Sequence, residues 1–564
     1  MSSPVPFTSR AIYLSGLAGL VVLALVLRLP LLGWAAGSYR LTEAFSIEEV
    51  ENIRISTGML HERSANPHAF EYPSLFYYLS LLAEVPARAL KGADWTSYLM
   101  AVRGLSLVFG LAVVVLGAEL GRRLGGPLAG LLAGSLLVTD RTMIELSTMA
   151  KPNMAQVAFL LAAFLALLAL TTRPRLRTAC LAAACLALAA ASKWLGALGL
   201  FGLAAAPALA AGAALAPAGE RGLLGLVRAI GRGLRVPLPA PRLVLPLAVF
   251  AAVVLVVMPF ALLSPKEFGY GLGQVFFAQV GNRRALPAWI SLDYARQSLG
   301  WVGTLLAAGG VAWGITQLLR WDGTPRARRL ALVVGWTVGY GLLVLFVFAR
   351  LPSYVDLLVP FLAALAGAAW AGHDGWLRRP ALARLAVVVA LLGGVLANAA
   401  YARTRSSDAR GDTRTAAGRW LAAHARVEDR LVADLGVFVP DSLVHVRWNW
   451  WGNPPRVIYD ETKTWGDDPV WPDDWYGGHR QVWFVNARWS PPESLLATQP
   501  RFVATHAEWV AHRRRPGRST YGASGYDSSL ADGSAGYAAV ARFVGGPQTT
   551  GPEILIYERK RSRP

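Results

Sequence analysis

The chain has 564 residues, of which 54% are hydrophobic and only 16% are charged, and its mean hydropathy is +0.40. These values exclude an ordinary soluble globular protein and indicate a polytopic membrane protein. The formal net charge of +20 comes from arginines in short clusters between apolar runs, not from a basic tail or stripe, so we expect no nucleic-acid partner.

Runs of about 20 mostly apolar residues predict membrane-spanning helices. About eleven such runs follow one another along the chain, at 11–33, 100–120, 127–146, 155–171, 178–193, 195–213, 243–263, 298–318, 330–348, 355–372 and 384–401. The first run has one arginine before it and no small-residue cleavage site, so we expect it to remain as an anchor. Cys180 and Cys185 lie within an apolar run without histidine partners, which predicts neither a zinc site nor a disulfide.

Basic connections between the runs predict the orientation of the chain in a cytoplasmic (inner) membrane. They are rich in arginine and almost free of acid, and they comprise 121–126, 171–178, 220–242, 320–329 and 376–384. All of them are cytoplasmic if 11–33 crosses outward from a cytoplasmic N-terminus and 100–120 crosses back. The apolar stretch 72–90 then lies at the outer surface or dips into it. A spanning helix there is the alternative, but it would place 121–126 and 171–178 outside.

The composition changes after residue 401. Residues 402–564 are polar and rich in tryptophan and glycine, with short β-like runs such as RLVAD, RVIYD, QVWFVN and ILIYER after an amphipathic helix at 412–425. We therefore predict a mainly α fold with two domains. Residues 1–401 form a transmembrane helical bundle with external loops at 34–99 and 264–297, and 402–564 form an extracytoplasmic α/β domain.

The first external loop carries an unusual set of acids. The stretch FSIEEVENIRISTGMLHERSANPHAFEYPSLFYYL (45–79) contains four glutamates, Glu48, Glu49, Glu51 and Glu62. If 46–60 is helical, Glu48, Glu51, Asn52 and Ile55 share one face, with Glu49 on the neighbouring face. A carboxylate held at a membrane surface suits a general base, whereas a solvated helix face is the simpler interpretation.

The order of motifs resembles that of the GT-C glycosyltransferases of the dolichyl-phosphate-mannose protein mannosyltransferase type (glycosyltransferase family 39). In that family an Asp-Glu pair follows the first span, and a helix, an Asn-Pro and a Tyr-Pro-x-Leu with aromatics come after it. Here the same order is Glu48-Glu49, Asn66-Pro67 and YPSLFYY (72–78). Less specific similarities follow at Arg103 in YLMAVRGLS, MAKPNMAQ (149–156), SKWLGAL (192–198) and YVDLLVPFLAALAG (354–367).

The resemblance implies a membrane glycosyltransferase whose donor is a sugar on a polyprenyl phosphate and whose acceptor is a glycan, lipid or protein. Such a donor is too apolar to leave the bilayer, and the sequence contains no G-x-G-x-x-G after a strand that would bind a nucleotide. The acceptor hydroxyl gives its proton to a carboxylate and displaces the lipid phosphate with inversion, while fixed cations stabilise the leaving group. Neither the sugar nor the acceptor can be read from the sequence.

The resemblance also suggests roles for single residues. Glu48 takes the position of the catalytic base, and Glu49 is the next candidate, orienting the acceptor. The expected substrate-binding residues are Tyr72, Arg103, Lys151, Asn153, Lys193, Arg283 and Arg284. Snorkelling at the ends of spans and contact with lipid headgroups are the alternatives for the cations. The chain departs from the family at Glu48 and at Asn153, where the family has aspartates, so a second carboxylate is missing at 153.

Metal binding and two other classes of protein are the remaining alternatives. His61 and His68 with Glu62 and Glu71 could bind a divalent ion, but their spacing matches no metal motif, so we assign no metal ligands. The tryptophan- and aspartate-rich stretch 447–480 suits either carbohydrate or packing at the membrane face. A transporter or flippase would place acids such as Asp140 and Glu145 on a central path. A non-catalytic scaffold would leave the loop motifs without a purpose.

Overall fold

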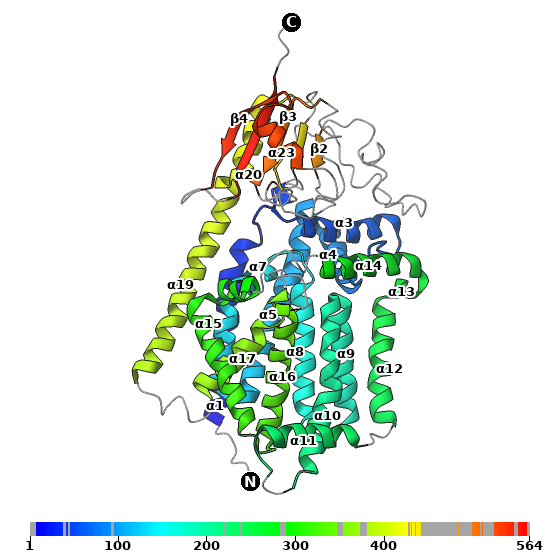
Figure 1. Cartoon of the computed structure of the whole chain (residues 1–564), viewed down its shortest axis with the longest axis vertical. Coiled ribbons are helices and arrows are strands. Elements are labelled where there is room, and N and C mark those ends of the chain that lie inside the picture. Colours follow the sequence, from blue (N-terminus) through cyan, green and yellow to red (C-terminus); the bar gives the residue numbers. More distant parts are fainter. Residues whose placement is uncertain are drawn as a thin grey trace. The chain divides into compact units, whose positions relative to one another are not determined.

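The computed structural model divides into two compact units (Figure 1). Unit 1 consists of residues 1–32, 65–85 and 101–402, and unit 2 consists of residues 33–64, 86–100 and 403–564. The structure describes residues 7–37, 41–42, 45–91, 95–217, 220–236, 240–281, 289–346, 354–372, 381–426, 429, 431–434, 436–440, 482–485, 499–507, 510, 524–545 and 551–560.

In the part of unit 1 that the structure describes, every regular element is a helix. In chain order its elements are α1 (Phe7–Arg28), η1 (Leu29–Leu31), α4 (Leu75–Lys91), α5 (Trp95–Gly125), α6 (Pro127–Val138), α7 (Arg141–Ser147), α8 (Asn153–Leu170), α9 (Leu176–Ser192), η2 (Trp194–Leu200), α10 (Phe201–Ala214), α11 (Gly222–Arg235), α12 (Ala240–Val257), α13 (Phe260–Leu263), α14 (Pro265–Gly281), α15 (Trp289–Leu319), α16 (Pro325–Phe346), α17 (Val359–Ala371) and α19 (Ala381–Gly411). Helices α4, α5 and α19 each continue into unit 2.

The apolar helices confirm the predicted multi-pass membrane class. Six helical segments in the described part of the chain are long and apolar enough to cross a membrane, namely Arg10–Leu31, Trp95–Gly125, Asn153–Leu170, Trp194–Ala214, Ile290–Leu319 and Pro325–Phe346. Five shorter apolar helices accompany them, at Pro127–Val138, Leu176–Ser192, Val244–Val257, Val359–Ala371 and Val387–Tyr401. Each predicted span overlaps one of these segments. Helix α4, which carries Glu84, Arg88 and Lys91, is not among them.

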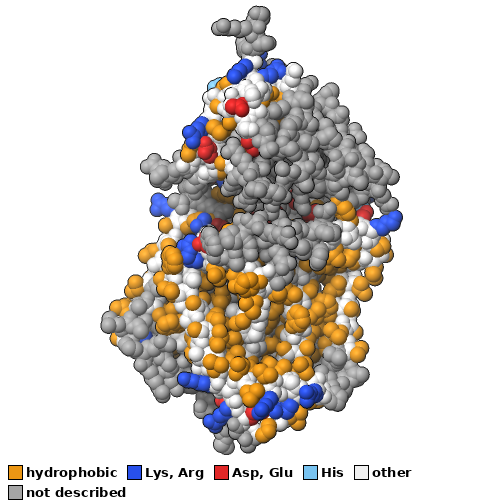
Figure 2. Space-filling view, in the orientation of Figure 1, with side chains coloured by type: hydrophobic (Ala, Val, Ile, Leu, Met, Phe, Trp, Pro, Cys, Tyr) orange, Lys and Arg blue, Asp and Glu red, His pale blue; other side chains and the backbone are white. Residues whose placement is uncertain are grey.

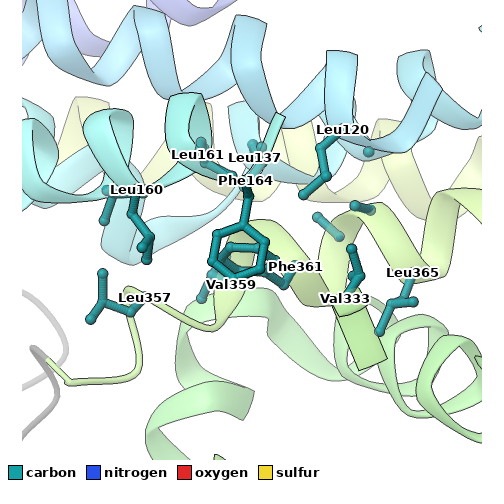
Figure 3. Packing of buried hydrophobic residues seen from close by; sticks show 14 of the residues in the cluster. Leu120, Leu137, Leu160, Leu161, Phe164, Val333, Leu357, Val359, Phe361 and Leu365 are labelled. Carbon is teal, nitrogen blue, oxygen red and sulfur yellow. The ribbon is translucent and has the colours of Figure 1, made fainter. Parts of the chain in front are cut away.

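The core of unit 1 is packed with aliphatic and aromatic side chains from α5, α6, α8, α16 and α17 (Figure 3). At its centre the Phe164 and Phe361 rings meet edge to face, with their centroids 4.7 Å apart. Small residues bring the helices close together, since a Cβ on Gly367 of α17 would lie only 2.2 Å from the carbonyl oxygen of Ala129 in α6. Such small-residue contacts are typical of helix packing in membranes.

The outer surface of unit 1 carries apolar side chains that a soluble protein would bury. In Figure 2 they form a wide hydrophobic area, with Lys and Arg side chains gathered along one rim. Val22, Val256 and Trp301 belong to this exposed set, at 60%, 77% and 68% of their full exposure. This distribution fits a surface that faces lipid and ends at a charged membrane boundary.

Four of the five basic connections, 121–126, 171–178, 220–242 and 320–329, meet at one end of unit 1, and most of the fifth lies outside the described residues. The Arg328 guanidinium donates to the carbonyl of Thr171 at 2.8 Å, and that of Arg329 donates to the carbonyl of Arg123 at 3.5 Å. The Gly222 N–H donates to the carbonyl of Trp321 at 2.9 Å, which brings the third connection to the same end. Sharing one end is what the predicted topology requires of these connections. The side of the membrane that this end faces stays a prediction.

Helix α11, within the connection predicted only as a basic loop, is amphipathic. One face packs against α10 through small residues, since a Cβ on Gly233 would lie 1.9 Å from the carbonyl oxygen of Ala208. Another face exposes a stripe of large apolar residues at helical spacing, Leu223, Val227, Ile230 and Leu234. The sequence analysis missed this helix because its glycines and arginines interrupt the apolar run. An apolar stripe beside arginines is typical of helices that lie in the membrane interface.

Unit 2 contains the α/β part, which confirms the predicted fold class. Its elements are α3 (Ile47–Glu62), α20 (Thr413–His424), β1 (Leu431–Asp434), β2 (Val482–Val485), β3 (Phe502–His506), α23 (Ser524–Ala531), β4 (Tyr537–Phe543) and β5 (Ile554–Arg559). The strand order is β2-β1-β3-β5-β4, with β1 parallel to β2 and β3, and β5 antiparallel to β3 and β4. Three predicted β-like runs are strands β1, β2 and β5, and the fourth, RVIYD, lies outside the described residues.

Alternating side chains bury both faces of this sheet. Leu431 and Phe502 pack with Leu421 of α20 on one face. Val432 and Val503 pack with Leu530 of α23 on the other. The sheet is therefore the middle layer between two helices.

Unit 2 also takes in two parts of the first external loop, 33–64 and 86–100. The Trp95 indole N–H donates to the Thr42 hydroxyl at 3.2 Å, which joins the two loop segments. The Arg414 guanidinium of α20 lies 3.9 Å from the centroid of the Phe45 ring, a cation–π contact that joins the loop to the C-terminal segment. The glutamate-bearing loop and the C-terminal α/β segment therefore form one body.

Candidate active site

The glutamate-rich stretch forms a helix, as predicted. Helix α3 runs from Ile47 to Glu62 and ends at Arg63, whose left-handed backbone (φ 52°) terminates it. Its buried face is polar as well as apolar, and consists of Glu49, Asn52, Ile53 and Ser56. Glu48 and Glu51 are both exposed, as their predicted common face requires, and Asn52, four residues after Glu48 and three after Glu49, lies at the buried edge of that face.

The two neighbouring glutamates thus lie in different environments. The Glu49 carboxylate is completely buried, whereas that of Glu48 is open to an incoming molecule. A base must come within hydrogen-bond distance of the proton that it removes. Of the pair, only Glu48 can be reached without moving the helix.

Three of the predicted substrate-binding residues belong to one polar cluster in unit 1, and a fourth, Lys151, lies two residues before one of them in the chain. We define the polar cluster as Tyr72, Asn153, Lys193 and Asp356. It occupies the start of α8, the residue that ends α9, and the segment before α17. The Asn153 carboxamide donates to the Asp356 carboxylate at 2.7 Å. One helical turn along α8, the Gln156 carboxamide donates to the Lys193 carbonyl at 3.0 Å.

Lys193 is surrounded by groups that favour a cation. Its ammonium lies 5.8 Å from the centroid of the Tyr72 ring and 5.9 Å from that of Tyr354. The Asp356 carboxylate is close enough for the two charges to interact. Aromatic faces and a carboxylate attract a positive charge, and more strongly where water is largely excluded. Lys193 is 9% exposed, so it forms a sheltered cationic centre.

Asp356 is not among the predicted site residues. It lies in YVDLLVPFLAALAG, a stretch whose resemblance to the family rests on its tyrosine and proline. A lone acid at the start of an otherwise apolar run was the available signal, since ionisable residues within spans are rare and usually functional.

The other predicted cations differ in their surroundings. Arg103 of α5 is 1% exposed, and its guanidinium donates to the carbonyl of Leu32 at 2.6 Å. That bond fixes the end of the first helix. Ser106, one turn further along α5, donates to the backbone carbonyl of Lys151 at 3.5 Å, so α5 lies beside the polar cluster. Arg283 and Arg284 lie outside the described residues.

The loop before α4 is attached to α14 by what we call the loop anchor, formed by Asn66, His68 and Glu267. The Asn66 carboxamide donates to Glu267 at 3.3 Å, and the His68 imidazole Nδ1 lies 3.2 Å from the same carboxylate. The rings of Phe70 and Phe268 pack edge to face beside them. The Asn-Pro motif of the resemblance therefore positions the loop that carries Tyr72.

The possible metal ligands do not converge in the described part of the chain. No group of three or more His, Cys, Asp or Glu side chains there could hold an ion. His68 lies against Glu267 instead, and Glu71 is exposed. The side chain of His61 and the aspartate pairs at 467–468 and 473–474 lie outside what the structure describes.

Replacing Glu267 by alanine should loosen the loop anchor. The change removes the hydrogen bond from Asn66 and the contact with His68, which we expect to lower local stability by about 1–2 kcal/mol. Hydrogen exchange of the amides in 65–74 should then become roughly tenfold faster, because each 1.4 kcal/mol corresponds to a factor of about ten. Glu71→Ala removes an exposed carboxylate from the same loop and is the control. Equal exchange in both variants would contradict the anchoring role.

The two acids that a transporter would place on a central path make structural contacts between and within helices. Asp140 accepts the Met143 backbone N–H at 2.8 Å, which caps α7, and it also accepts the Ser298 hydroxyl at 2.7 Å. Glu145 accepts the Tyr401 hydroxyl and pairs with Arg141 at 3.3 Å. Both carboxylates therefore have structural partners.

Arg28 of α1 is a buried cation with a complete set of acceptors. Its guanidinium donates to the Ser147 hydroxyl at 2.9 Å, to the Leu137 carbonyl at 3.3 Å and to the Val138 carbonyl at 3.4 Å. The negative charge of Asp140 also acts on it. Arg28 thus holds α1 against the C-terminal end of α6 and against α7.

Comparison with solved structures shows that the chain has the fold of GT-C glycosyltransferases. It is similar to ArnT from Cupriavidus metallidurans bound to undecaprenyl phosphate, with a TM-score of 0.51, 13% identity, and coverage of 96% of this chain and 97% of that chain. The archaeal oligosaccharyltransferase AglB from Archaeoglobus fulgidus, in complex with an inhibitory peptide and a dolichol-phosphate, gives a TM-score of 0.49 and 12% identity, covering 97% of this chain and 74% of that chain. The sequence matches no known protein family and no curated protein. Identities this low establish the fold alone.

Proposed function

We propose that the protein is a membrane glycosyltransferase that takes a sugar from a polyprenyl-phosphate donor. The observation that carries this proposal is the polar cluster, which places the Lys193 ammonium between aromatic rings and a carboxylate at the ends of membrane helices. A lipid phosphate can reach such a site without leaving the bilayer. The similar ArnT structure holds undecaprenyl phosphate, which supports the same class of donor here.

In the proposed reaction, Glu48 acts as the general base. The acceptor oxygen forms a bond to the anomeric carbon as its proton passes to the Glu48 carboxylate. The bond between that carbon and the phosphate oxygen breaks, and the polyprenyl phosphate leaves with the bonding electron pair. The configuration inverts because the attack is a single displacement. Lys193 and Lys151 stabilise the phosphate, whose negative charge increases as it leaves.

Glu49 has a positioning role in this proposal. Its carboxylate is fully buried on the face of α3 next to that of Glu48, so it cannot meet an acceptor without a movement of the helix. It fixes the rotation of α3 and thereby the direction in which Glu48 points. Asp140 and Glu145, which a transporter would use, are engaged at helix ends, so the geometry favours transfer over transport.

An assay of turnover tests the proposed function. Purified protein is incubated with a panel of polyprenyl-phosphate sugars and with extracted membrane lipids and glycans as acceptors. Release of free polyprenyl phosphate is then followed. We expect release with at least one sugar, dependent on Lys193. Absence of release with the whole panel, together with no binding of undecaprenyl phosphate by the wild-type protein, would contradict the proposal.

We further propose an orientation in which the N-terminus is cytoplasmic and unit 2 lies outside the cytoplasmic membrane. Single cysteines at positions 62, 175 and 532, all exposed, report on it after Cys180 and Cys185 are replaced by alanine. An impermeant thiol reagent added to intact cells should label positions 62 and 532, and position 175 only after the membrane is opened. Labelling of position 175 in intact cells would reverse the orientation and place the glutamates of α3 inside.

A further inference from the structure

Asp356 is a fully buried carboxylate at the meeting point of three segments of unit 1. It lies just before α17, accepts the Asn153 carboxamide of α8 at 2.7 Å and interacts with the charge of Lys193 at the end of α9. Its second carboxylate oxygen, Oδ1, has no hydrogen-bond partner among the residues that the structure describes.

A charge in this position needs compensation. An isolated ionised carboxylate is very unfavourable in an apolar interior, and so is an isolated ammonium. The charges of Asp356 and Lys193 therefore each favour the ionised form of the other, against the cost of burial. The Asn153 carboxamide holds Oδ2, so the orientation of the carboxylate, and with it the direction of its field on Lys193, is fixed from α8.

We propose that Asp356 is a positioning residue that keeps Lys193 charged and directed for binding the phosphate of the donor. The proposal rests on the proposed function. It also explains how the site can have the neutral Asn153 at a position where the resembled family has an aspartate. The negative charge beside Lys193 is supplied instead by Asp356, in the segment before α17. Asn153 supplies the hydrogen bond and Asp356 supplies the charge.

The rival interpretation is that Asp356 only ties α17 to α8. Asp356→Asn separates the two roles, because asparagine retains the size of the side chain and an oxygen that can accept from Asn153, but not the charge. A structural tie would survive this substitution. An electrostatic role would be lost.

The experiment compares wild type with Asp356→Asn in two measurements, steady-state turnover with varied donor and binding of undecaprenyl phosphate alone. We expect the KM for the donor to rise about 10- to 100-fold with a smaller change in kcat, since a weakened contact with the phosphate of the bound donor raises KM, whereas kcat falls only when the lost contact is stronger in the transition state. Binding of undecaprenyl phosphate should weaken by the same factor. Asp140→Asn, another buried aspartate in unit 1 that caps a helix, is the control and should leave donor KM unchanged.

A reciprocal exchange tests whether the charge itself is required. Asn153→Asp combined with Asp356→Asn moves the carboxylate across the 2.7 Å contact and should restore most of the donor affinity. This double variant also decides the question if Asp356→Asn fails to fold.

Two results would overturn the inference. In one, the single variant has a donor KM within about twofold of wild type. In the other, the double variant Asn153→Asp/Asp356→Asn is folded but binds undecaprenyl phosphate no more tightly than the single variant Asp356→Asn does. A wild-type protein that neither binds nor turns over the lipid phosphate would instead refute the proposed function, so the two failures are distinguishable.

Discussion

Replacing Glu48 by glutamine is expected to lower kcat by about 10²- to 10⁴-fold, the usual contribution of a general base. The glutamine has nearly the same size but cannot take the acceptor proton. Because Glu48 is exposed, the change should leave the thermal unfolding temperature of the purified protein almost unaltered. Steady-state release of polyprenyl phosphate, with donor and acceptor saturating, measures the effect.

Three further substitutions on α3 serve as comparisons for Glu48→Gln. Glu48→Asp shortens the side chain by one methylene and should retain part of the activity, since about 1 Å of displacement can lower a rate by about 100-fold. Glu62→Gln changes an exposed glutamate at the far end of the same helix and should behave as wild type. Glu49→Gln should lower the activity mainly by lowering the stability of the folded protein. If Glu49→Gln were inactive but fully stable while Glu48→Gln remained active, the roles of the two residues would be reversed.

Replacing Arg28 by methionine is expected to lower the free energy of unfolding by about 3–5 kcal/mol, as for other buried charges that lose their partner. The change removes the bonds to Ser147 and to the end of α6, and it leaves the Asp140 charge without its counter-ion. Because methionine inserts into a membrane more readily than arginine, a loss of stability in this variant could not be attributed to poorer membrane insertion. Thermal or denaturant unfolding in detergent measures the change.

Arg10 provides the matched control, because it lies on the same helix and is exposed. Arg10→Met should change stability by less than about 0.5 kcal/mol. Equal losses in both variants would show that Arg28 contributes nothing beyond an ordinary membrane-boundary arginine.

Much of the bundle could be predicted because apolar length is a direct physical requirement for crossing a membrane. The eleven runs, the helix at 47–62 and the strands at 431–434, 482–485 and 554–559 all follow from local patterns. Helix α11 was missed because its apolar stripe is dispersed among glycines and arginines. The mixed sheet order could not be predicted, since β1 pairs with strands that lie far along the chain.

The candidate site could be predicted in its parts but not in its assembly. Motif order pointed to Lys151, Asn153 and Lys193, and the structure brings them to one end of the bundle. Asp356 could not be found from spacing, since its bond to Asn153 joins residues 203 positions apart. The rotation of α3 could not be predicted either, because helical spacing gives only the relative directions of its side chains and packing decides which of them face inward.

Unit 2 is built from segments that lie far apart in the sequence, which affects the order in which its parts are synthesised. Its first pieces end at residue 100, and its last piece begins at residue 403. At a translation speed of about 5–20 residues per second, the ribosome needs roughly 15–60 s to produce the chain between them. During that interval the glutamate-bearing helix lacks the contacts that the C-terminal segment of unit 2 later provides. We expect C-terminal truncations to leave this early segment exposed to proteases even where every membrane helix has been inserted.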